Sequence, residues 1–142
     1  MKPTDHTLVS HVGAPIEKVF AVLSDPARIP EWLPACRAAS ASGPLRKGAK
    51  IKVRFGEARE TEFEVIDFSA PNTFGWAERN GRKGHKTFFR LDFAGGSTAV
   101  TIKDVWTPPT FAAWLRAKFS AKRNVAKVLD GTVQNLRAAV AR

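Results

Sequence analysis

The sequence contains a single cysteine, Cys36, among its 142 residues, so no intramolecular disulfide can form. It has no tyrosine but 10 Phe and 4 Trp, so few of its large rings carry a polar group. No hydrophobic run approaches the ~18 to 20 residues of a membrane span, and the first residues lack the apolar segment of a secretory signal. We therefore expect a globular, cytoplasmic protein.

The sequence also lacks the short motifs that bind metals or phosphates. It contains no HExxH, paired CxxC, GxGxxG or phosphate-loop pattern, and His6 and His11 do not have the spacing of metal ligands. We expect no metal and no tightly bound cofactor. Cys36 has no base near it in the sequence pattern, which favours a small buried hydrophobe over a nucleophile.

Acidic residues are under-represented: 13 Asp and Glu stand against 23 Lys and Arg, for a net charge of +10. Much of the excess follows Pro109. A solvated, basic face of a helix would account for this excess of positive charge. The stretch around Arg116, Lys118 and Arg123 is also aromatic, so a transient contact with an anionic membrane is an alternative. Only the positive charge would support binding to nucleic acid, and no recognition motif is present, so we expect no nucleic-acid partner.

The N-terminal third predicts one strand and two short helices. Residues 8–12 read as a strand, and Pro15 opens a helix whose apolar side includes Val19 and Phe20. The first helix ends at Asp25, which also caps a second short helix on which Trp32 points inward.

A charge ladder predicts the register of the next two strands. Basic residues alternate with apolar ones over residues 50–55, and glutamates alternate with apolar ones over residues 60–65. A hairpin about residues 56–58 brings opposite charges together on one face. The predicted pairs are Arg54 with Glu60, Lys52 with Glu62, and Lys50 with Glu64.

Two further hairpins follow if Asn80-Gly81 and Gly95-Gly96 are both two-residue turns. Four rows of residues on these strands then share the inner face of the sheet. The rows are Trp76, His85 and Trp106; Phe74, Thr87 and Asp104; Phe89 and Ile102; and Leu91 and Val100.

A long helix is predicted from about Pro109 to the C-terminus. Lys122 interrupts the apolar stripe of this helix. Its side chain either lies along a pocket, with its charge at the mouth where it would suit a carboxylate or phenolate, or reaches the surface. The stripe, spaced for one helix face, is Leu115, Phe119, Lys122, Ala126, Leu129, Val133, Leu136 and Val140.

Several segments resemble one known superfamily. Residues 14–20 are similar to its "AP-x-E-x-V-W/F" opening, residues 25–34 to its "D-P…W-x-P" segment, and residues 43–48 to the loop before its third strand. Residues 89–91 and 95–101 resemble its last hairpin. The chain is thereby similar to the START-like, pollen-allergen-like SRPBCC superfamily, and most similar to its polyketide cyclase/dehydrase and lipid transport branch.

The resemblance implies an α+β helix-grip fold over residues 1–142, taken as a single domain. A curved antiparallel sheet of about seven strands would wrap on the long C-terminal helix, with two short helices after the first strand. This fold hosts carriers, cyclases, hydrolases and binders, so it does not by itself define the chemistry.

We interpret the chain as a carrier or sensor that binds a lipid-like or polycyclic molecule in an internal pocket. One alternative is a cyclase or dehydratase in which Asp104 orients His85 as a general base; another is a docking module that uses the basic helix. Glu78 either reaches the same rim or pairs with Lys83. The predicted ligand-binding residues are Phe63, Phe74, Trp76, His85, Thr87, Phe89, Ile102, Asp104, Trp106, Leu115, Phe119 and Lys122.

Overall fold

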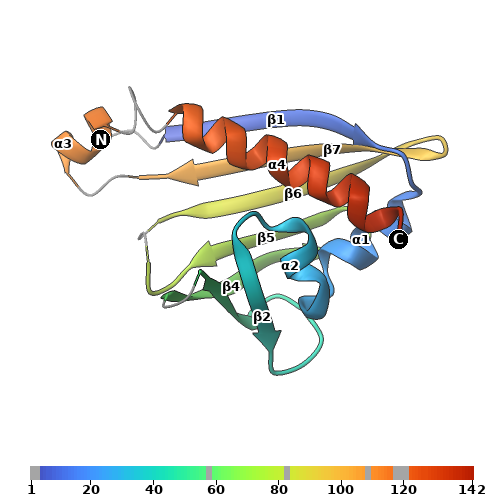
Figure 1. Cartoon of the computed structure of the whole chain (residues 1–142), viewed down its shortest axis with the longest axis horizontal. Coiled ribbons are helices and arrows are strands. Elements are labelled where there is room, and N and C mark those ends of the chain that lie inside the picture. The colour runs from blue at the N-terminus through green and yellow to red at the C-terminus, as the bar shows by residue number, and fades with distance from the viewer. Residues whose placement is uncertain (1–3, 57–58, 82–83, 108–109, 117–121) are drawn as a thin grey trace.

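A computed structural model describes residues 4–56, 59–81, 84–107, 110–116 and 122–142 (Figure 1). The strands are β1 (Thr4–Val12), β2 (Cys36–Ala41), β3 (Lys50–Phe55), β4 (Arg59–Ser69), β5 (Thr73–Glu78), β6 (Lys86–Ala94) and β7 (Ser97–Trp106). The helices are α1 (Ile16–Leu23), a 3-10 turn η1 (Pro26–Arg28), α2 (Ile29–Trp32), α3 (Phe111–Arg116) and α4 (Lys122–Val140).

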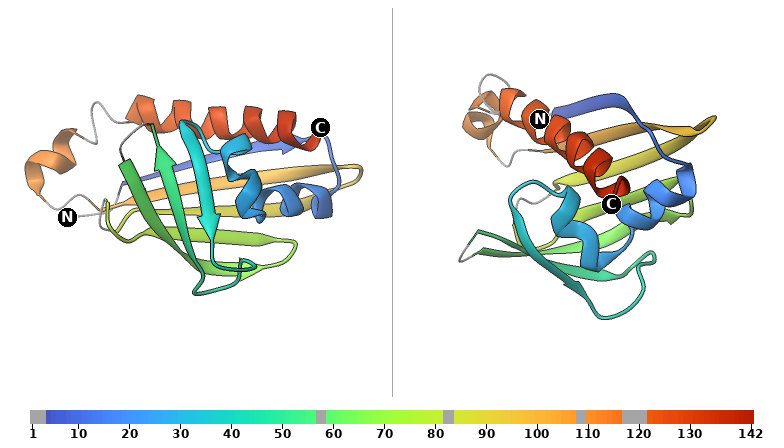
Figure 2. Two further views of the ribbon diagram at one scale, coloured as in Figure 1. Left: turned by 60° about the horizontal axis from the view of Figure 1, so that its bottom comes forward. Right: turned by 45° about the vertical axis from the view of Figure 1, so that its right-hand side comes forward.

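The seven strands form one antiparallel sheet in the order β1-β7-β6-β5-β4-β3-β2. Figure 2 shows the sheet curving beneath α4, with α1 and α2 near one end of that helix and α3 beyond the other. This is the helix-grip arrangement that the sequence predicts. The sheet can bury its concave apolar face only against another element, and α4 supplies that cover.

The predicted register of the β3–β4 hairpin is confirmed. Lys50 pairs with Glu64, Lys52 with Glu62, and Arg54 with Glu60. The Lys50 ammonium lies 3.7 Å from a Glu62 carboxylate oxygen and 3.8 Å from one of Glu64. The alternating Ile51, Val53 and Phe63 are buried on the other face, so a one-residue slip would place lysines in the core.

The β6–β7 hairpin is also confirmed. Ala94 pairs with Ser97 across Gly95-Gly96, and Phe89 pairs with Ile102. Thr87 lies opposite Asp104, as predicted.

The prediction for the β5–β6 hairpin is wrong by two residues. Trp76 pairs with Thr87 and not with His85, because Asn80-Gly81 is not the turn. Asn80 instead pairs with β4: its side-chain oxygen accepts a 2.7 Å hydrogen bond from the Glu62 amide, and the Arg79 amide donates to the Glu62 carbonyl at 2.8 Å. The strand pairing thus runs past residue 78, and the connection to β6 is longer than a two-residue turn.

The sequence predicts one C-terminal helix from about Pro109, and the structure describes two helical segments there, α3 and α4. Residues 117–121, where the prediction would join them, lie outside the described residues. Within α4 the predicted stripe is confirmed at Leu129, Val133, Leu136 and Val140, which are all buried. Ala126 is exposed and does not belong to it.

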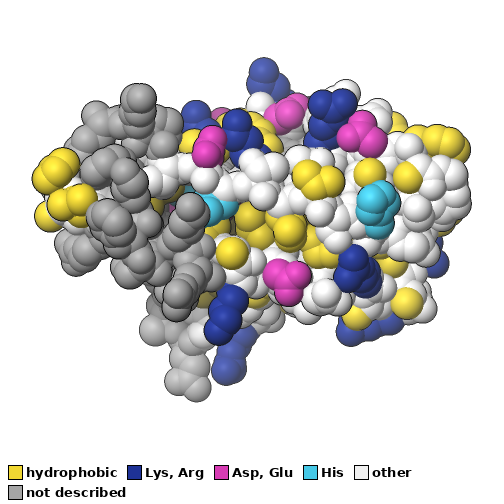
Figure 3. All heavy atoms as spheres, turned by 90° about the horizontal axis from the view of Figure 1, so that it is seen from above, with side chains coloured by type: hydrophobic (Ala, Val, Ile, Leu, Met, Phe, Trp, Pro, Cys, Tyr) yellow, Lys and Arg dark blue, Asp and Glu magenta, His cyan; other side chains and the backbone are white. Residues whose placement is uncertain are grey.

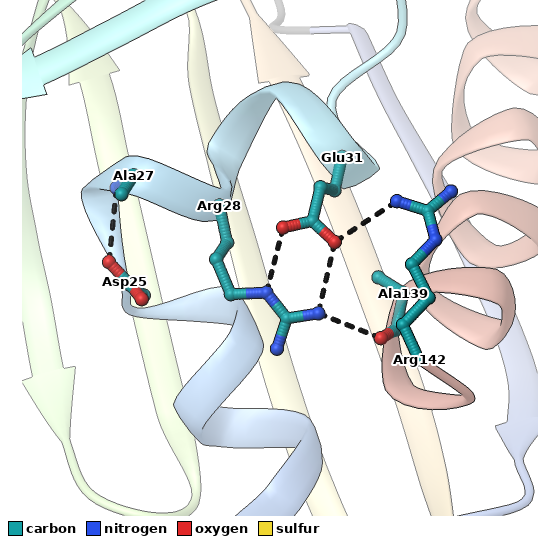
Figure 4. A network of polar contacts seen from close by, with 6 residues as sticks. All are labelled: Asp25, Ala27, Arg28, Glu31, Ala139 and Arg142. Carbon is teal, nitrogen blue, oxygen red and sulfur yellow. Dashed lines mark hydrogen bonds and ion pairs between the residues drawn. The ribbon is translucent and has the colours of Figure 1, made fainter.

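Polar contacts fix the C-terminal half of α4 to the rest of the molecule. Figure 4 shows Arg28 gripping the Glu31 carboxylate at 2.8 and 2.9 Å while it donates to the Ala139 carbonyl at 2.8 Å. Arg142 reaches the same carboxylate at 3.2 Å. On the other side, Arg137 donates to the His11 carbonyl at 3.0 Å. An arginine on a terminal carbonyl satisfies one of the acceptors that a helix end leaves open.

These contacts make stability depend on pH. The hydrogen bond from Arg28 lowers the pKa of Glu31 below its ordinary value of 4.5. A lowered folded-state pKa gives a contribution that is present above pH 4.5 and lost as the pH falls through the folded value. Glu31→Gln should therefore destabilise the protein at pH 7 and cost progressively less towards pH 3, as urea unfolding at each pH would measure. Glu60→Gln, at an exposed position, is the matched control, and an equal pH dependence in both variants would contradict the assignment.

Two glycines should respond to alanine in opposite directions. A Cβ on Gly131, within α4, would meet Pro34 at 3.6 Å, an ordinary contact, so Gly131→Ala should stabilise the protein by roughly 0.5–1 kcal/mol through helix propensity. A Cβ on Gly75 would lie 2.7 Å from the Phe88 ring, so Gly75→Ala should destabilise. Urea unfolding checks both, and a destabilised Gly131→Ala protein would show that α4 cannot accept the methyl group.

Candidate ligand-binding site

A cavity of about 460 Å³ lies between the concave face of the sheet, the segment after α2, and α4. The sheet contributes Phe55, Phe63, Trp76, Glu78, His85, Thr87, Phe89, Ile102 and Asp104. The end of α2, the segment after it and the helix α4 contribute Trp32, Leu33, Pro34, Ala35, Val125, Val128, Leu129 and Thr132.

Aromatic rings form most of the apolar wall on the side of the sheet. Phe63 stacks on Trp76 with ring centroids 4.2 Å apart, and Trp32 lies 5.7 Å from Trp76 and 5.4 Å, edge to face, from Phe89. Trp32 and Trp76 are buried, because the α2 segment brings the first ring down onto the sheet. Such rings form a rigid apolar surface that suits flat or ring-bearing ligands.

The other part of the wall is a polar cluster of Glu78, His85, Thr87 and Asp104. His85 lies between two carboxylates: its Nδ1 is 2.8 Å from Glu78 Oε1 and its Nε2 is 2.8 Å from Asp104 Oδ2. Thr87 donates to the same Asp104 oxygen at 3.2 Å. The side chains of Glu78 and His85 are each 8% exposed, and that of Asp104 is 14% exposed.

This geometry constrains the protons of the polar cluster. A neutral imidazole carries hydrogen on one ring nitrogen only, so both contacts of His85 are hydrogen bonds only when the cluster holds one additional proton. That proton is on the second ring nitrogen or on one carboxyl group. The neighbouring strand β1 places His6 opposite Asp104, but His6 does not line the cavity.

The structure brings together seven of the predicted site residues. His85 and Asp104, predicted to lie within reach of one another across β6 and β7, are in direct contact. The predicted residues that line the cavity are Phe63, Trp76, His85, Thr87, Phe89, Ile102 and Asp104.

Other predicted residues lie elsewhere. Phe74 is fully buried behind the wall, where its ring packs 5.7 Å from Trp76, and it is not among the residues that line the cavity. Trp106, near the end of β7, and Leu115, on α3, are not among the residues that line the cavity. Phe119, Lys83 and the side chain of Lys122 lie outside the described residues, as does most of the basic stretch.

Sequence analysis missed the part of the cavity that α2 and α4 supply. Trp32 and Pro34 stand in the segment that resembles the superfamily's "D-P…W-x-P" pattern, so that pattern was the available signal. On α4, Val125, Val128 and Thr132 have the spacing of one helix face, but they lie beside the predicted stripe. Glu78 was left open between the rim and Lys83, and it contacts His85.

Cys36 does not have the surroundings of a nucleophile. It is partly buried at the start of β2, and desolvation raises the pKa of its thiol. A raised pKa keeps the thiol protonated at neutral pH. Among the described residues, no group of three or more His, Cys, Asp and Glu side chains is placed to hold a metal ion.

A larger hollow of about 680 Å³ lies along residues 41–50, but it has neither aromatic walls nor buried ionisable groups. Figure 3 shows the face that carries α4, where hydrophobic side chains are visible between polar ones in the middle of the face. The aromatic cavity is therefore the better candidate site. No helix in the described ranges is long and apolar enough to cross a membrane.

The strand order and the long helix over the concave face define a helix-grip protein of the START and pollen-allergen type. Residues 4–141 match the model of the polyketide cyclase/dehydrase and lipid transport family, and the chain belongs to this family. Family and fold together support a hydrophobic-ligand-binding or polyketide-cyclase-like role. No curated protein has a significantly similar sequence.

Solved structures with this fold have low sequence identity to the chain. A START superfamily protein from Mycobacterium smegmatis is 15% identical with a TM-score of 0.75, and the match covers 96% of this chain and 97% of that one. Ara h 8.0201 is 13% identical with a TM-score of 0.73, covering 99% of both chains. The di-domain ARO/CYC StfQ from the steffimycin biosynthetic pathway is 11% identical with a TM-score of 0.76, covering 96% of this chain and 50% of that one.

Proposed function

We propose that this protein binds an apolar, ring-bearing small molecule in the cavity beneath α4, as a carrier or sensor. The observation that carries the proposal is an aromatic cavity of about 460 Å³ with a single buried polar cluster in its wall. Ligand pockets typically span roughly 300–1,000 Å³, are mostly apolar, and use a few polar groups to orient the ligand.

The protonation geometry favours binding over catalysis. A general base needs a ring nitrogen that can take a proton from the substrate, and both nitrogens of His85 lie 2.8 Å from protein carboxylates. This arrangement holds the imidazole ring in place. It supports a role for His85 in shaping the wall of the cavity.

Filling the cavity should strongly weaken binding. Val125 is partly buried and lines the cavity, whereas its neighbour Ala126 is exposed on the same helix. Val125→Trp should weaken binding of the neutral fluorescent dye N-phenyl-1-naphthylamine at least about tenfold, because the indole occupies the ligand's volume. Ala126→Trp is the matched control and should bind like wild type. Equal binding by both variants would show that the dye sits elsewhere and would overturn the site.

A second candidate function is that of a cyclase or dehydratase. It is favoured by the burial of His85 and Asp104 at the wall of an apolar cavity, where an acid–base pair would face a bound polyketide-like substrate. The di-domain ARO/CYC StfQ, which has the same fold, belongs by its name to this kind of chemistry. For this function, substrate would have to displace one carboxylate from the imidazole.

His85→Gln separates the two functions. If His85 is the general acid or base, turnover of an identified substrate should fall by ~10²–10⁴ while binding is largely kept. If the protein is a carrier, the variant should alter ligand affinity modestly, and the ligand extracted after long incubation should be chemically unchanged by mass spectrometry. Thr87→Ser, which keeps the hydroxyl beside Asp104, serves as the control.

A further inference from the structure

We infer that Asp104 selects the ligand: the cavity takes apolar molecules that present a hydrogen-bond donor, such as a hydroxyl group, and rejects free carboxylates. The inference rests on the proposed function and specifies its ligand class. It follows from the charge of the polar cluster and from one oxygen atom of Asp104.

The polar cluster contains more carboxylates than basic groups. Among the described residues that line the cavity, the ionisable ones are Glu78, Asp104 and His85. The described part of the cavity wall thus holds two carboxylates and one imidazole, and it contains no Lys or Arg. A ligand carboxylate placed here would lose its hydration and meet like charge, whereas a donor group would be stabilised.

Asp104 offers the acceptor for such a donor. Its Oδ2 atom takes the contacts from His85 Nε2 at 2.8 Å and from Thr87 Oγ1 at 3.2 Å. Its Oδ1 atom has no hydrogen-bond partner in the described part of the chain, and Asp104 lines the cavity. Because His85 and Thr87 fix the orientation of the carboxylate, Oδ1 is a preorganised acceptor for a molecule in the cavity.

The acceptor lies beside the aromatic wall. Asp104 pairs with Thr87 across β6 and β7, and Thr87 pairs with Trp76 across β5 and β6. A flat molecule packed on the Trp76 and Phe63 rings would thus have one edge near Asp104. This places the donor at the edge of a ring system, as in a phenol.

Three naphthalene probes of matched shape test the inference: 2-methylnaphthalene, 2-naphthol and 2-naphthoate, with dissociation constants measured by displacement of N-phenyl-1-naphthylamine at pH 7. A hydrogen bond to a charged acceptor should make 2-naphthol about tenfold tighter than 2-methylnaphthalene, with 2-naphthoate the weakest. Asp104→Asn should reduce the naphthol preference and strengthen naphthoate. Asp92→Asn, which removes the same charge at a half-exposed position of β6 away from the cavity, should leave the order unchanged.

Glu78→Gln provides a second variant in case Asp104→Asn does not fold. It keeps the acceptor and removes one negative charge, so naphthoate should bind more tightly while naphthol holds its advantage over 2-methylnaphthalene. Wild-type protein that binds naphthoate as tightly as naphthol, or the wild-type order retained in Asp104→Asn, would overturn the inference. If 2-methylnaphthalene binds as tightly as 2-naphthol, the inference is overturned but the proposed function is not. Failure of all three probes to bind overturns the proposed function as well.

Discussion

The concave face of the sheet, which α4 covers, carries both apolar side chains and ionisable ones. Phe63, Trp76 and Phe89 must be shielded from water, whereas Glu78 and Asp104 need polar partners once they are buried. Where α4 packs closely, at Leu136 and Val140, the core is filled. Where it faces the carboxylates, no apolar side chain could pack against them without cost. The cavity lies at that boundary, so it is a consequence of the composition of the sheet face.

His85 makes this boundary stable. Without it, two buried carboxylates would lie near each other in a low-dielectric region, which is strongly unfavourable. With it, each carboxylate has a partner at 2.8 Å, and the three side chains hold one another in place across β5, β6 and β7. A single histidine therefore has a structural reason to be present, whichever ligand the protein takes.

The fold could be predicted from the sequence because short-range signals fix it. The Lys50–Glu64 ladder and the Gly95-Gly96 turn each define a register from neighbouring residues, and both registers are correct. The β5–β6 connection failed because the side chain of Asn80 bonds to β4, a contact that no local pattern reveals. The His85–Asp104 contact survived this error, since it depends only on the β6–β7 register.

The roles of Trp32 and Val125 in the site could not be predicted in the same way. They reach the cavity from elements distant in the sequence, through the packing of α2 and α4 on the sheet. Periodicity shows that a helix has a buried side, but it does not show how far along the sheet that side makes contact. For this reason the predicted site extended towards Leu115 and Phe119, whereas the described residues of α4 that line the cavity run from Val125 to Thr132.

The bonds of Arg28 to Ala139 and of Arg137 to His11 have a mechanical consequence for α4. They anchor its C-terminal turns, whereas the residues that close the cavity, Val125 to Thr132, lie towards the other end. A rigid-body tilt of the helix would therefore pivot near Ala139. Val125 is 14 residues from Ala139, roughly 21 Å along the helix axis. A tilt of only about 10° would move Val125 by roughly 4 Å, enough to widen an entrance while the pivot contacts stay intact. The same tilt would hardly move Leu136, because that residue lies only three positions from the pivot.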